Sequence, residues 1–250
     1  MSQISKWAIV HARLVKTVAS ENNLLMNLIE EFKAKEPWIT KFEIGGINYG
    51  GNFDAANDQR IDYFFESFPG VKTVLELGSL EGGHSFALAR NPSVEKVIAI
   101  EARDKNIEKA KFVQKLLNDE KVEFIEADLE KTDFAKLGEF DAVFCSGLLY
   151  HLLEPWKLIE QCRKISPNIF IWTQYACENE AKKFSSGFRG KWYREKGWGD
   201  PLSGVSKYSF WLSMGSLINL LTTNDYENVQ IIENDLKHPH GCAVTLSAKK

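Results

Sequence analysis

The run Thr73–Gly83, read as Thr-Val-Leu-Glu-Leu-Gly-Ser-Leu-Glu-Gly-Gly, is the feature that most constrains what this chain can fold into. An apolar strand breaks there into a glycine-rich turn, and glycine permits backbone conformations and close approaches that side chains block. Glu76 places a carboxylate beside the turn, and Gly78, Ser79 and Gly82 follow it. The pattern predicts a strand that ends in a backbone cradle for another molecule.

The charge beside this cradle indicates what kind of molecule it holds. The carboxylate of Glu76 would repel the pyrophosphate of a dinucleotide. It would attract a cofactor that carries a cationic sulfonium and an ammonium group. The charge therefore favours S-adenosylmethionine over a dinucleotide.

Composition sets broad limits on the rest. A chain of 250 residues with 44% hydrophobic content can bury a full core. Its net charge of -3 argues against a surface built as a whole to hold nucleic acid, although a local basic patch remains compatible with it.

The cysteines and the N-terminal segment give an expectation for the compartment. Four scattered cysteines show neither C-x-x-C metal spacing nor the density of a secreted disulfide scaffold, which predicts a reducing cytosol. No cluster with metal-ligand spacing stands out. His11, Arg13 and Lys16 interrupt the first segment, so we expect no signal peptide and no membrane span.

Beyond Gly70, strand-like and helix-like segments alternate. This alternation predicts a doubly wound α/β sheet of mostly parallel strands with helical crossovers. The last two strands, near 229–233 and 243–248, are joined by a turn too short for a crossover helix and should pair antiparallel. The other expected strands lie near Thr73–Leu77, Lys96–Ile100, Val122–Ile125, Phe140–Cys145 and Ile169–Thr173.

Two further segments stand outside this pattern. Apolar spacing over residues 4–35 predicts one or two amphipathic helices, followed by a turn-rich linker at 45–52. We therefore expect an N-terminal helical appendage or lid over 1–58 and a main domain over 59–250. A Gly- and aromatic-rich insertion near 176–212 is expected to form a cap on that domain.

Polar residues follow each expected parallel strand, where ligands of open α/β sheets bind. Glu101, with Ala102 next to it, ends the second strand, and its carboxylate suits two ribose hydroxyls. Asp128, followed by Leu129, comes after the third strand and suits an adenine amino group. Ser146 follows the fourth strand at the start of a loop.

The order of these motifs resembles the class I S-adenosylmethionine-dependent methyltransferases, over about Val71 to Lys249. In that family an acid precedes Gly-x-Gly-x-Gly; here the run is Glu-Leu-Gly-Ser-Leu-Glu-Gly, with Leu80 at the middle glycine, which implies a changed turn. The segment Phe140–Leu152 looks like the family's fourth-strand motif. The resemblance implies a seven-stranded sheet that ends in an antiparallel hairpin.

The same resemblance implies roles for the residues that follow the strands. Glu76 and Gly78 would face the methionine end of the cofactor, and Glu101 the ribose. Asp128 with Leu129 would face the adenine, and Ser146 the reaction mouth. Within the class, the chain looks closest to a branch with the transfer-RNA wobble-uridine carboxymethyl enzyme and many small-molecule methyltransferases.

The loop after the fourth strand supplies the candidates for chemistry. His151 is the best candidate base for an acceptor that must lose a proton, because an unperturbed imidazole titrates near pH ~6.5. Tyr150 is the alternative, as a residue that orients the acceptor. In the insertion, cationic and aromatic side chains are interleaved, and Arg189, Arg194 and Trp192 are the predicted acceptor-binding residues.

The expected function is methyl transfer from S-adenosylmethionine to an oxygen or nitrogen atom of a small molecule. Three alternatives remain open at this point. They are a transfer-RNA base modifier, a nicotinamide oxidoreductase, which Glu76 and the terminal hairpin disfavour, and a cofactor-binding protein without catalysis. The sequence does not indicate the acceptor or the oligomeric state.

Overall fold

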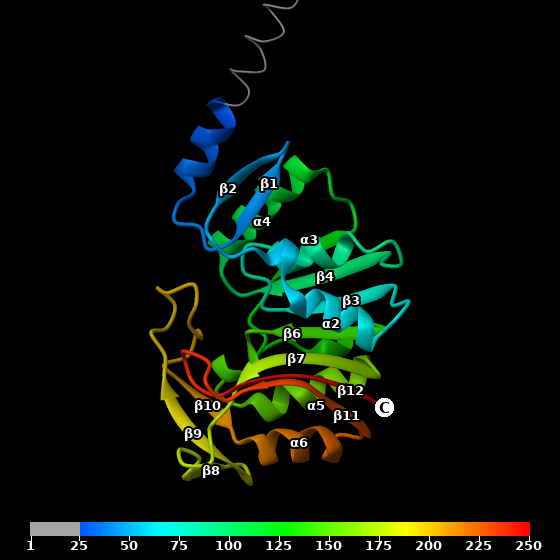
Figure 1. Ribbon diagram of the computed structural model, residues 1–250, viewed down its shortest axis with the longest axis vertical. Helices are drawn as coiled ribbons and strands as arrows, with labels where there is room; N and C mark the ends of the chain where they lie inside the picture. Colours follow the sequence, from blue (N-terminus) through cyan, green and yellow to red (C-terminus); the bar gives the residue numbers. More distant parts are fainter. Residues whose placement is uncertain (1–25) are drawn as a thin grey trace, which may run out of the picture. The chain divides into compact units, whose positions relative to one another are not determined.

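The structure is a computed structural model that describes residues 26–250 (Figure 1). The chain divides into two compact units, one ending at Phe53 and the other spanning Asp54–Lys250. Most of the expected N-terminal helical region lies outside the described residues. Within the first unit, residues 26–34 are helical.

The rest of the first unit is a short β-hairpin rather than a linker. Strands β1 (Lys41–Ile44) and β2 (Ile47–Gly50) pair antiparallel. Gly45 and Gly46 form the turn with φ of 60° and 80°, the left-handed conformation that two-residue hairpin turns require. Turn residues dominate so short a segment in sequence, and this hides the four-residue strands on either side.

The second unit carries the main sheet and its helices. Its strands are β3 (Thr73–Leu77), β4 (Lys96–Glu101), β5 (Val122–Glu126), β6 (Ala142–Ser146), β7 (Asn168–Gln174), β8 (Lys183–Ser185), β9 (Phe188–Arg194), β10 (Tyr208–Leu212), β11 (Asn228–Asp235) and β12 (Ala243–Lys249). Its α-helices are α2 (Gln59–Ser67), α3 (Gly83–Ala89), α4 (Asp104–Leu117), α5 (Pro155–Ile165) and α6 (Met214–Thr223). Short 3-10 turns occupy η1 (Ala55–Asn57), η2 (Phe134–Lys136) and η3 (Leu149–His151).

The main sheet has seven strands in the order β11-β12-β7-β6-β3-β4-β5. Strands β3 to β7 run parallel, and β12 pairs antiparallel with both β7 and β11. The predicted fold class and its terminal antiparallel hairpin are therefore confirmed. The strand order reverses at β3, which lies between β4 and β6, so a ligand crevice is expected beyond the carboxyl ends of these strands.

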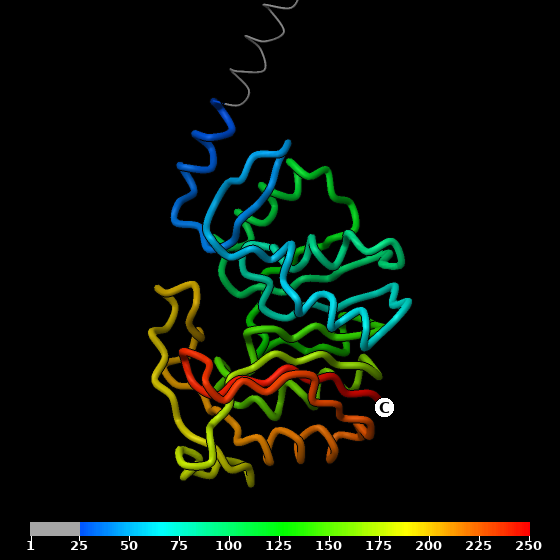
Figure 2. Tube along the Cα trace, in the orientation of Figure 1, coloured from blue at the N-terminus to red at the C-terminus, as the bar shows by residue number. Residues whose placement is uncertain are grey.

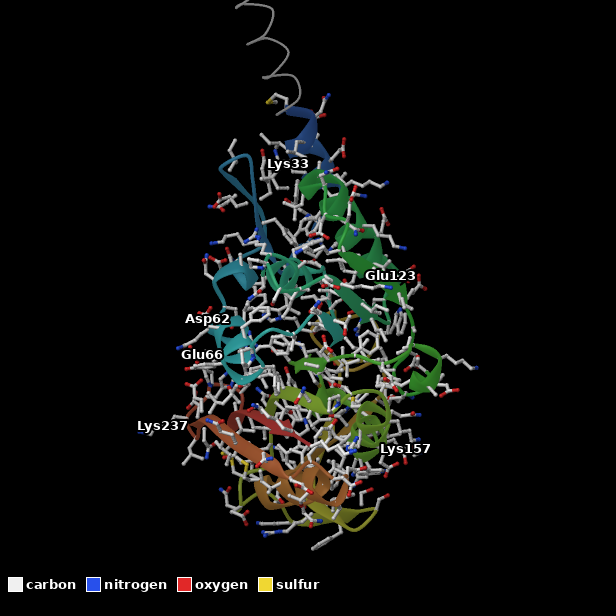
Figure 3. The ribbon with its side chains drawn as sticks, turned by 90° about the vertical axis from the view of Figure 1, so that its right-hand side faces the viewer. Lys33, Asp62, Glu66, Glu123, Lys157 and Lys237 are labelled. Atoms are coloured by element: carbon white, nitrogen blue, oxygen red, sulfur yellow. A yellow bond between two sulfur atoms is a disulfide. The ribbon has the colours of Figure 1, made fainter. Side chains whose placement is uncertain are left out.

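Helices cover both faces of the sheet, and the alternation of side chains along β6 and β7 shows why. Phe144 and Phe170 stack at 5.4 Å and meet Phe64 of α2 edge-on. Val143 points to the opposite face and shares a core cluster with Ile159 of α5. In Figure 3, the polar residues on the outer sides of these two helices point away from the sheet in opposite directions; the labelled ones are Asp62, Glu66 and Lys157.

The insertion between β7 and α6 forms a second sheet, which we call the cap sheet, with the order β10-β9-β8. All its strands pair antiparallel. It attaches to the loop after β6, because the backbone N–H of Phe210 donates to the carbonyl of Leu152 at 2.9 Å. Figure 2 shows the chain between β9 and β10 as a long excursion beside the end of the main sheet.

Cys177 and Cys242 form a disulfide, with their Cα atoms 5.9 Å apart. The cysteine spacing did not predict this pair, because 65 positions separate the two in sequence. Pairing of β7 with β12 brings them together, since Gln174 lies opposite Ala243. Cys145 and Cys162 are buried free thiols. Among residues 26–250, no helix has both the length and the apolar character that crossing a membrane requires.

Candidate functional site

The turn after β3 lies against the end of β4. The N–H groups of Gly78 and Ser79 both donate to the carbonyl of Ile100, at 2.8 and 3.0 Å. Leu80 adopts a left-handed φ of 52° and donates its N–H to Oε2 of Glu101 at 2.9 Å. Leucine at this position therefore takes a glycine-like conformation, and the turn is tied to the acid that ends β4.

Gly82 caps the N-terminus of α3 with a φ of 83°. A Cβ atom there would lie 2.8 Å from Cζ of Phe124 and 3.2 Å from Cβ of Ala110. No side chain fits at this position, so glycine lets the turn pack directly against the core beside β5 and α4. The hydroxyl of Ser79 in the same turn is buried and has no hydrogen-bond partner among the described residues.

Two buried carboxyl groups lie on neighbouring strands below this turn. Glu76 is 2% exposed and accepts a hydrogen bond from Ser85. Burial raises the pKa of Glu76 to about 7 against the bond from Ser85, and the Glu101 carboxyl adds to the rise. Burial also raises the pKa of Glu101, which accepts the N–H groups of Leu80 and Arg103. A cationic ligand would stabilise the ionised form of both acids.

Asp128 lies next to Glu101, because the N–H of Ala127 donates to the Glu101 carbonyl at 3.0 Å. Its carboxylate accepts hydrogen bonds within its own turn, from Glu130 N–H and Lys131 Nζ. Leu129 packs against the main core, and Ala102 is partly buried beside Glu101. The structure thus brings the predicted residues after β3, β4 and β5 to one edge of the sheet.

Ser146, at the end of β6, belongs to a second group that the sequence did not reveal. Nη1 of Arg60, from α2, lies 3.0 Å from the Ser146 hydroxyl, and its guanidinium covers the ring of Trp172 at 4.8 Å. Asp58 accepts hydrogen bonds from Arg60 and His84. Although burial alone would raise the pKa of Asp58, these two partners hold it far below its usual range. The only local signal is Asp58 at the N-cap of α2.

His151 follows β6 and pairs with Glu195, which lies just beyond β9. Nδ1 of His151 is 3.1 Å from Oε1 of Glu195. Glu195 is 8% exposed and also accepts the hydroxyls of Ser203 and Ser209, each at 2.7 Å. Burial would raise the pKa of Glu195, but the hydrogen bonds from His151 and the two serines hold it at about 2. Glu195 is therefore an ionised partner of the imidazole at ordinary pH.

Sequence reasoning did not single out Glu195 as a partner of His151. The available signal was an acid among cations, and nothing local links it to His151, 44 positions earlier.

Tyr150 stands beside His151, with ring centroids 4.1 Å apart. Its ring meets Trp172 and Trp211 edge-on, at 6.1 and 5.7 Å. Burial raises the pKa of Tyr150 to about 12, so its hydroxyl stays protonated as a donor. Nε1 of Trp211 is buried without a hydrogen-bond partner among residues 26–250. The Tyr150 ring thus lies beside the imidazole, and Trp211, which carries this N–H, lies next to Tyr150.

The alternation of side chains along β9 separates the cap sheet into two faces. Lys191, Tyr193 and Glu195 share one face, which we call the Tyr193 face. Tyr193 stacks on Trp211 at 4.8 Å, so this face leads to Tyr150 and His151. Trp192 lies on the other face and meets Phe210 at 5.0 Å.

The three residues predicted to bind the acceptor do not come together on the Tyr193 face. Trp192 and Arg194 share the opposite face of β9. Nη1 of Arg189 donates to the Glu178 carboxylate at 2.8 Å, and its Nε donates to the Ala181 carbonyl at 2.6 Å. Arg189 is therefore engaged with the loop that precedes β8.

Among the described residues, no group of three or more histidine, cysteine, aspartate or glutamate side chains is placed to hold a metal ion.

Comparison with known proteins adds independent findings. A family model described as a methyltransferase domain matches residues 75–167. The chain is 33% identical to the N-terminal domain of EvdMO1, solved in the presence of S-adenosylhomocysteine and D-fucose. That match has a TM-score of 0.81 and covers 90% of this chain and 96% of that one.

Two further structures extend this comparison. Against EvdMO1 as a whole, the chain is 30% identical with a TM-score of 0.71, and it spans 47% of that protein's length. YcgJ from Bacillus subtilis, at 14% identity and a TM-score of 0.56 over 77% of this chain and 98% of that one, shares the fold. Comparison with curated protein sequences finds no match.

Proposed function

This chain belongs to the class I S-adenosylmethionine-dependent methyltransferases, and we propose that it methylates a hydroxyl group of a small sugar. The observation that carries the proposal is the pair formed by His151 and Glu195 beside the end of β6. A sugar hydroxyl must lose its proton as it attacks, and this pair is built to remove it.

S-adenosylmethionine is the cofactor, and the turn after β3 fits it. The hydroxyl of Ser79, unpartnered among the described residues, and the two buried acids together suit a polar, cationic ligand. When bound, the cofactor supplies an electrophilic methyl carbon on its sulfonium. We propose that the following residues hold it, from the methionine end to the adenine: Glu76, Gly78, Ser79, Gly82, Glu101, Ala102, Asp128 and Leu129, with Ser146 at the reaction mouth.

The hydrogen bond to Glu195 assigns the proton on the imidazole of His151. A carboxylate only accepts, so Nδ1 carries the hydrogen of this bond and Nε2 is left to take a proton. In the proposed reaction, Nε2 accepts the proton of the acceptor hydroxyl while the oxygen forms a bond to the methyl carbon. The carbon–sulfur bond breaks, and the Glu195 carboxylate stabilises the imidazolium that forms.

A sugar is the favoured acceptor class for two reasons. The related N-terminal domain of EvdMO1 was solved in the presence of D-fucose. In this chain, the rings of Tyr150, Trp211 and Tyr193 contact one another in sequence from His151, and Nε1 of Trp211 is a buried donor without a partner among the described residues. A sugar presents C–H faces that pack on aromatic rings and hydroxyls that pair with such donors.

We place the acceptor on the Tyr193 face, in preference to a site made by Trp192, Arg189 and Arg194. A transfer-RNA acceptor is less favoured, because much of the positive charge near the cap sheet is paired within the protein. Lys191 pairs with Glu180 and Lys196 with Asp200. The ordered pair of His151 and Glu195 likewise favours an enzyme over a cofactor-binding protein without catalysis.

Two expectations from the sequence stay proposals of this account. One is that residues 1–58 act as a lid. The other is a cytoplasmic location, which predicts that Cys177 and Cys242 are reduced there, whereas the structure has them joined.

The proposal is tested by incubating the purified protein with S-adenosylmethionine and a panel containing D-fucose, other monosaccharides, amino sugars and a transfer-RNA mixture. We expect S-adenosylhomocysteine to form with a neutral sugar, and an O-methyl product by mass spectrometry and NMR. Turnover confined to amines or to the RNA, or no turnover with any sugar, would refute the assignment.

A further inference from the structure

We propose that Arg103 is a positioning residue that couples cofactor binding to the catalytic pair through the strap, which we define as residues 195–204. The inference rests on the proposed function for the role of His151, but its structural part concerns cofactor binding alone.

The side chain of Arg103 holds the strap by its backbone. Its Nη2 lies within hydrogen-bond distance of the carbonyls of Ser203, Asp200 and Gly197, at 2.7, 2.9 and 3.2 Å, so three acceptors share its two hydrogens. Its Nε donates to the carbonyl of Trp198 at 3.2 Å, and its guanidinium lies 5.6 Å from the Trp198 ring. One guanidinium thus binds four carbonyl groups of a single segment. A lysine ammonium lacks the planar, rigid arrangement of donors that this requires.

The backbone of Arg103 belongs to the cofactor edge of the sheet. Its N–H donates to Oε1 of Glu101 at 2.9 Å, while Leu80 N–H occupies Oε2. Glu101 is the proposed ribose acid. A ribose that bonds this carboxylate would therefore fix the position of Arg103 as well as that of Leu80, in the turn after β3.

The strap begins with one member of the proposed catalytic pair, Glu195, and its last residues bind that carboxylate. Ser203, whose carbonyl Arg103 holds, donates its hydroxyl to Oε2 of Glu195 at 2.7 Å. The N–H of Gly204 donates to the same oxygen at 2.9 Å. Contacts therefore run from Glu101 through Arg103 and Ser203 to Glu195, which holds His151.

The strap packs closely on His151. A Cβ atom at Gly204 would lie 2.5 Å from the backbone oxygen of His151 and 3.2 Å from Cδ of Glu195. A displaced strap would consequently move the carboxylate away from Nδ1. Because the coupling is reciprocal, a strap held in place also favours the arrangement of Glu101 that binds the cofactor.

The test compares Arg103→Met with Lys196→Met. Lys196 is an exposed strap residue whose Nζ pairs with Asp200, so its replacement removes a strap ion pair and leaves Arg103 and Glu195 untouched. The first measurement is the affinity for S-adenosylhomocysteine by calorimetry. The second is the hydrogen exchange of strap amides, with and without S-adenosylhomocysteine.

We expect S-adenosylhomocysteine to protect the strap amides in the wild type and in Lys196→Met. In Arg103→Met we expect that protection to be lost and the affinity to fall about tenfold, within the usual range of coupling between sites. The imidazole NMR signals of His151 should shift on S-adenosylhomocysteine binding in the wild type and stay unchanged in Arg103→Met.

Several results would overturn the proposal. One is that S-adenosylhomocysteine protects the strap amides of Arg103→Met as strongly as those of the wild type. Another is that it protects no strap amides in the wild type. A third is that the wild type does not bind S-adenosylhomocysteine. If Arg103→Met does not fold, Arg103→Lys carries the test; we expect weaker protection than in the wild type, and full protection would contradict the proposal. A wild type that shows the coupling but methylates no sugar would leave this inference standing and refute the proposed acceptor.

Discussion

Oε1 of Glu195, at the end of a cap strand, lies 3.1 Å from Nδ1 of His151, in the loop after the central strand β6. His151 follows a strand of the main sheet and Glu195 follows a strand of the cap sheet, so the two sheets together form this pair. Ser203 and Ser209 fix the carboxylate on its remaining sides, so the imidazole meets an oriented anion.

The depressed pKa of Glu195 predicts how stability depends on pH. Its pKa is about 2 in the folded chain and about 4.3 in an unfolded one, so its contribution is present above about pH 5 and is lost as pH falls toward 2. We expect the free energy of unfolding of the wild type, minus that of Glu195→Gln, to shrink by up to about 3 kcal/mol over this window. Denaturant titrations from pH 2 to 7 measure this difference. A difference that does not change with pH would contradict the assigned ionisation.

Glu76 predicts a proton release on cofactor binding. Its pKa of about 7 means that its ionisation costs folding stability as pH rises from about 4.3 to 7, and that it is about half protonated at pH 7. A bound cation favours the carboxylate, so we expect S-adenosylmethionine to release up to about half a proton at pH 7. Calorimetry in buffers of different ionisation enthalpy measures the release. It should vanish in Glu76→Gln, and an equal release in that variant would assign it elsewhere.

Tyr193 and Trp192 provide a matched pair for locating the acceptor. They are neighbours on β9 with the same exposure of 44%, but they point to opposite faces of the cap sheet. We expect Tyr193→Ala to raise the KM for the sugar about tenfold, the loss of roughly one aromatic contact, and Trp192→Ala to leave it unchanged. Steady-state kinetics measure both KM values. A raised KM in Trp192→Ala with an unchanged KM in Tyr193→Ala would place the acceptor on the Trp192 face instead.

Gly82 and Gly138 separate steric crowding from backbone strain. Both have positive φ, 83° and 88°, but a Cβ atom meets Phe124 at 2.8 Å at Gly82 and nothing within 4 Å at Gly138. We expect each alanine variant to lose about 1 kcal/mol from backbone strain, with a further ~1–3 kcal/mol at Gly82 only. Thermal or denaturant unfolding measures both. Equal losses would show that the cradle tolerates a side chain.

The fold was predictable because patterns within short stretches of the sequence determine it. Alternating apolar strands and amphipathic helices specify a parallel sheet, and the short connection before β12 specifies its antiparallel end. The clustering of residues after β3, β4 and β5 follows from the parallel direction of these strands. The β1–β2 hairpin was missed because glycines dominate a segment whose strands have only four residues each.

The unpredicted features depend on tertiary contacts between distant segments. His151 meets Glu195, Ser146 meets Arg60, and Cys177 meets Cys242 across 44, 86 and 65 positions. The face of β9 that a side chain occupies is also decided by the pairing of the cap strands. Trp192 and Tyr193 look equivalent in sequence for this reason.

The most direct test of the account is the rate of methyl transfer, in single turnovers, to the neutral sugar that the acceptor panel identifies, by the wild type, His151→Gln and His240→Gln. His240 lies in the exposed turn before β12 and serves as the control histidine. We predict that, at saturating S-adenosylmethionine, His151→Gln slows transfer by about 10²–10⁴-fold and His240→Gln has no effect. Transfer by His151→Gln at the wild-type rate would contradict the claim that His151 is the base.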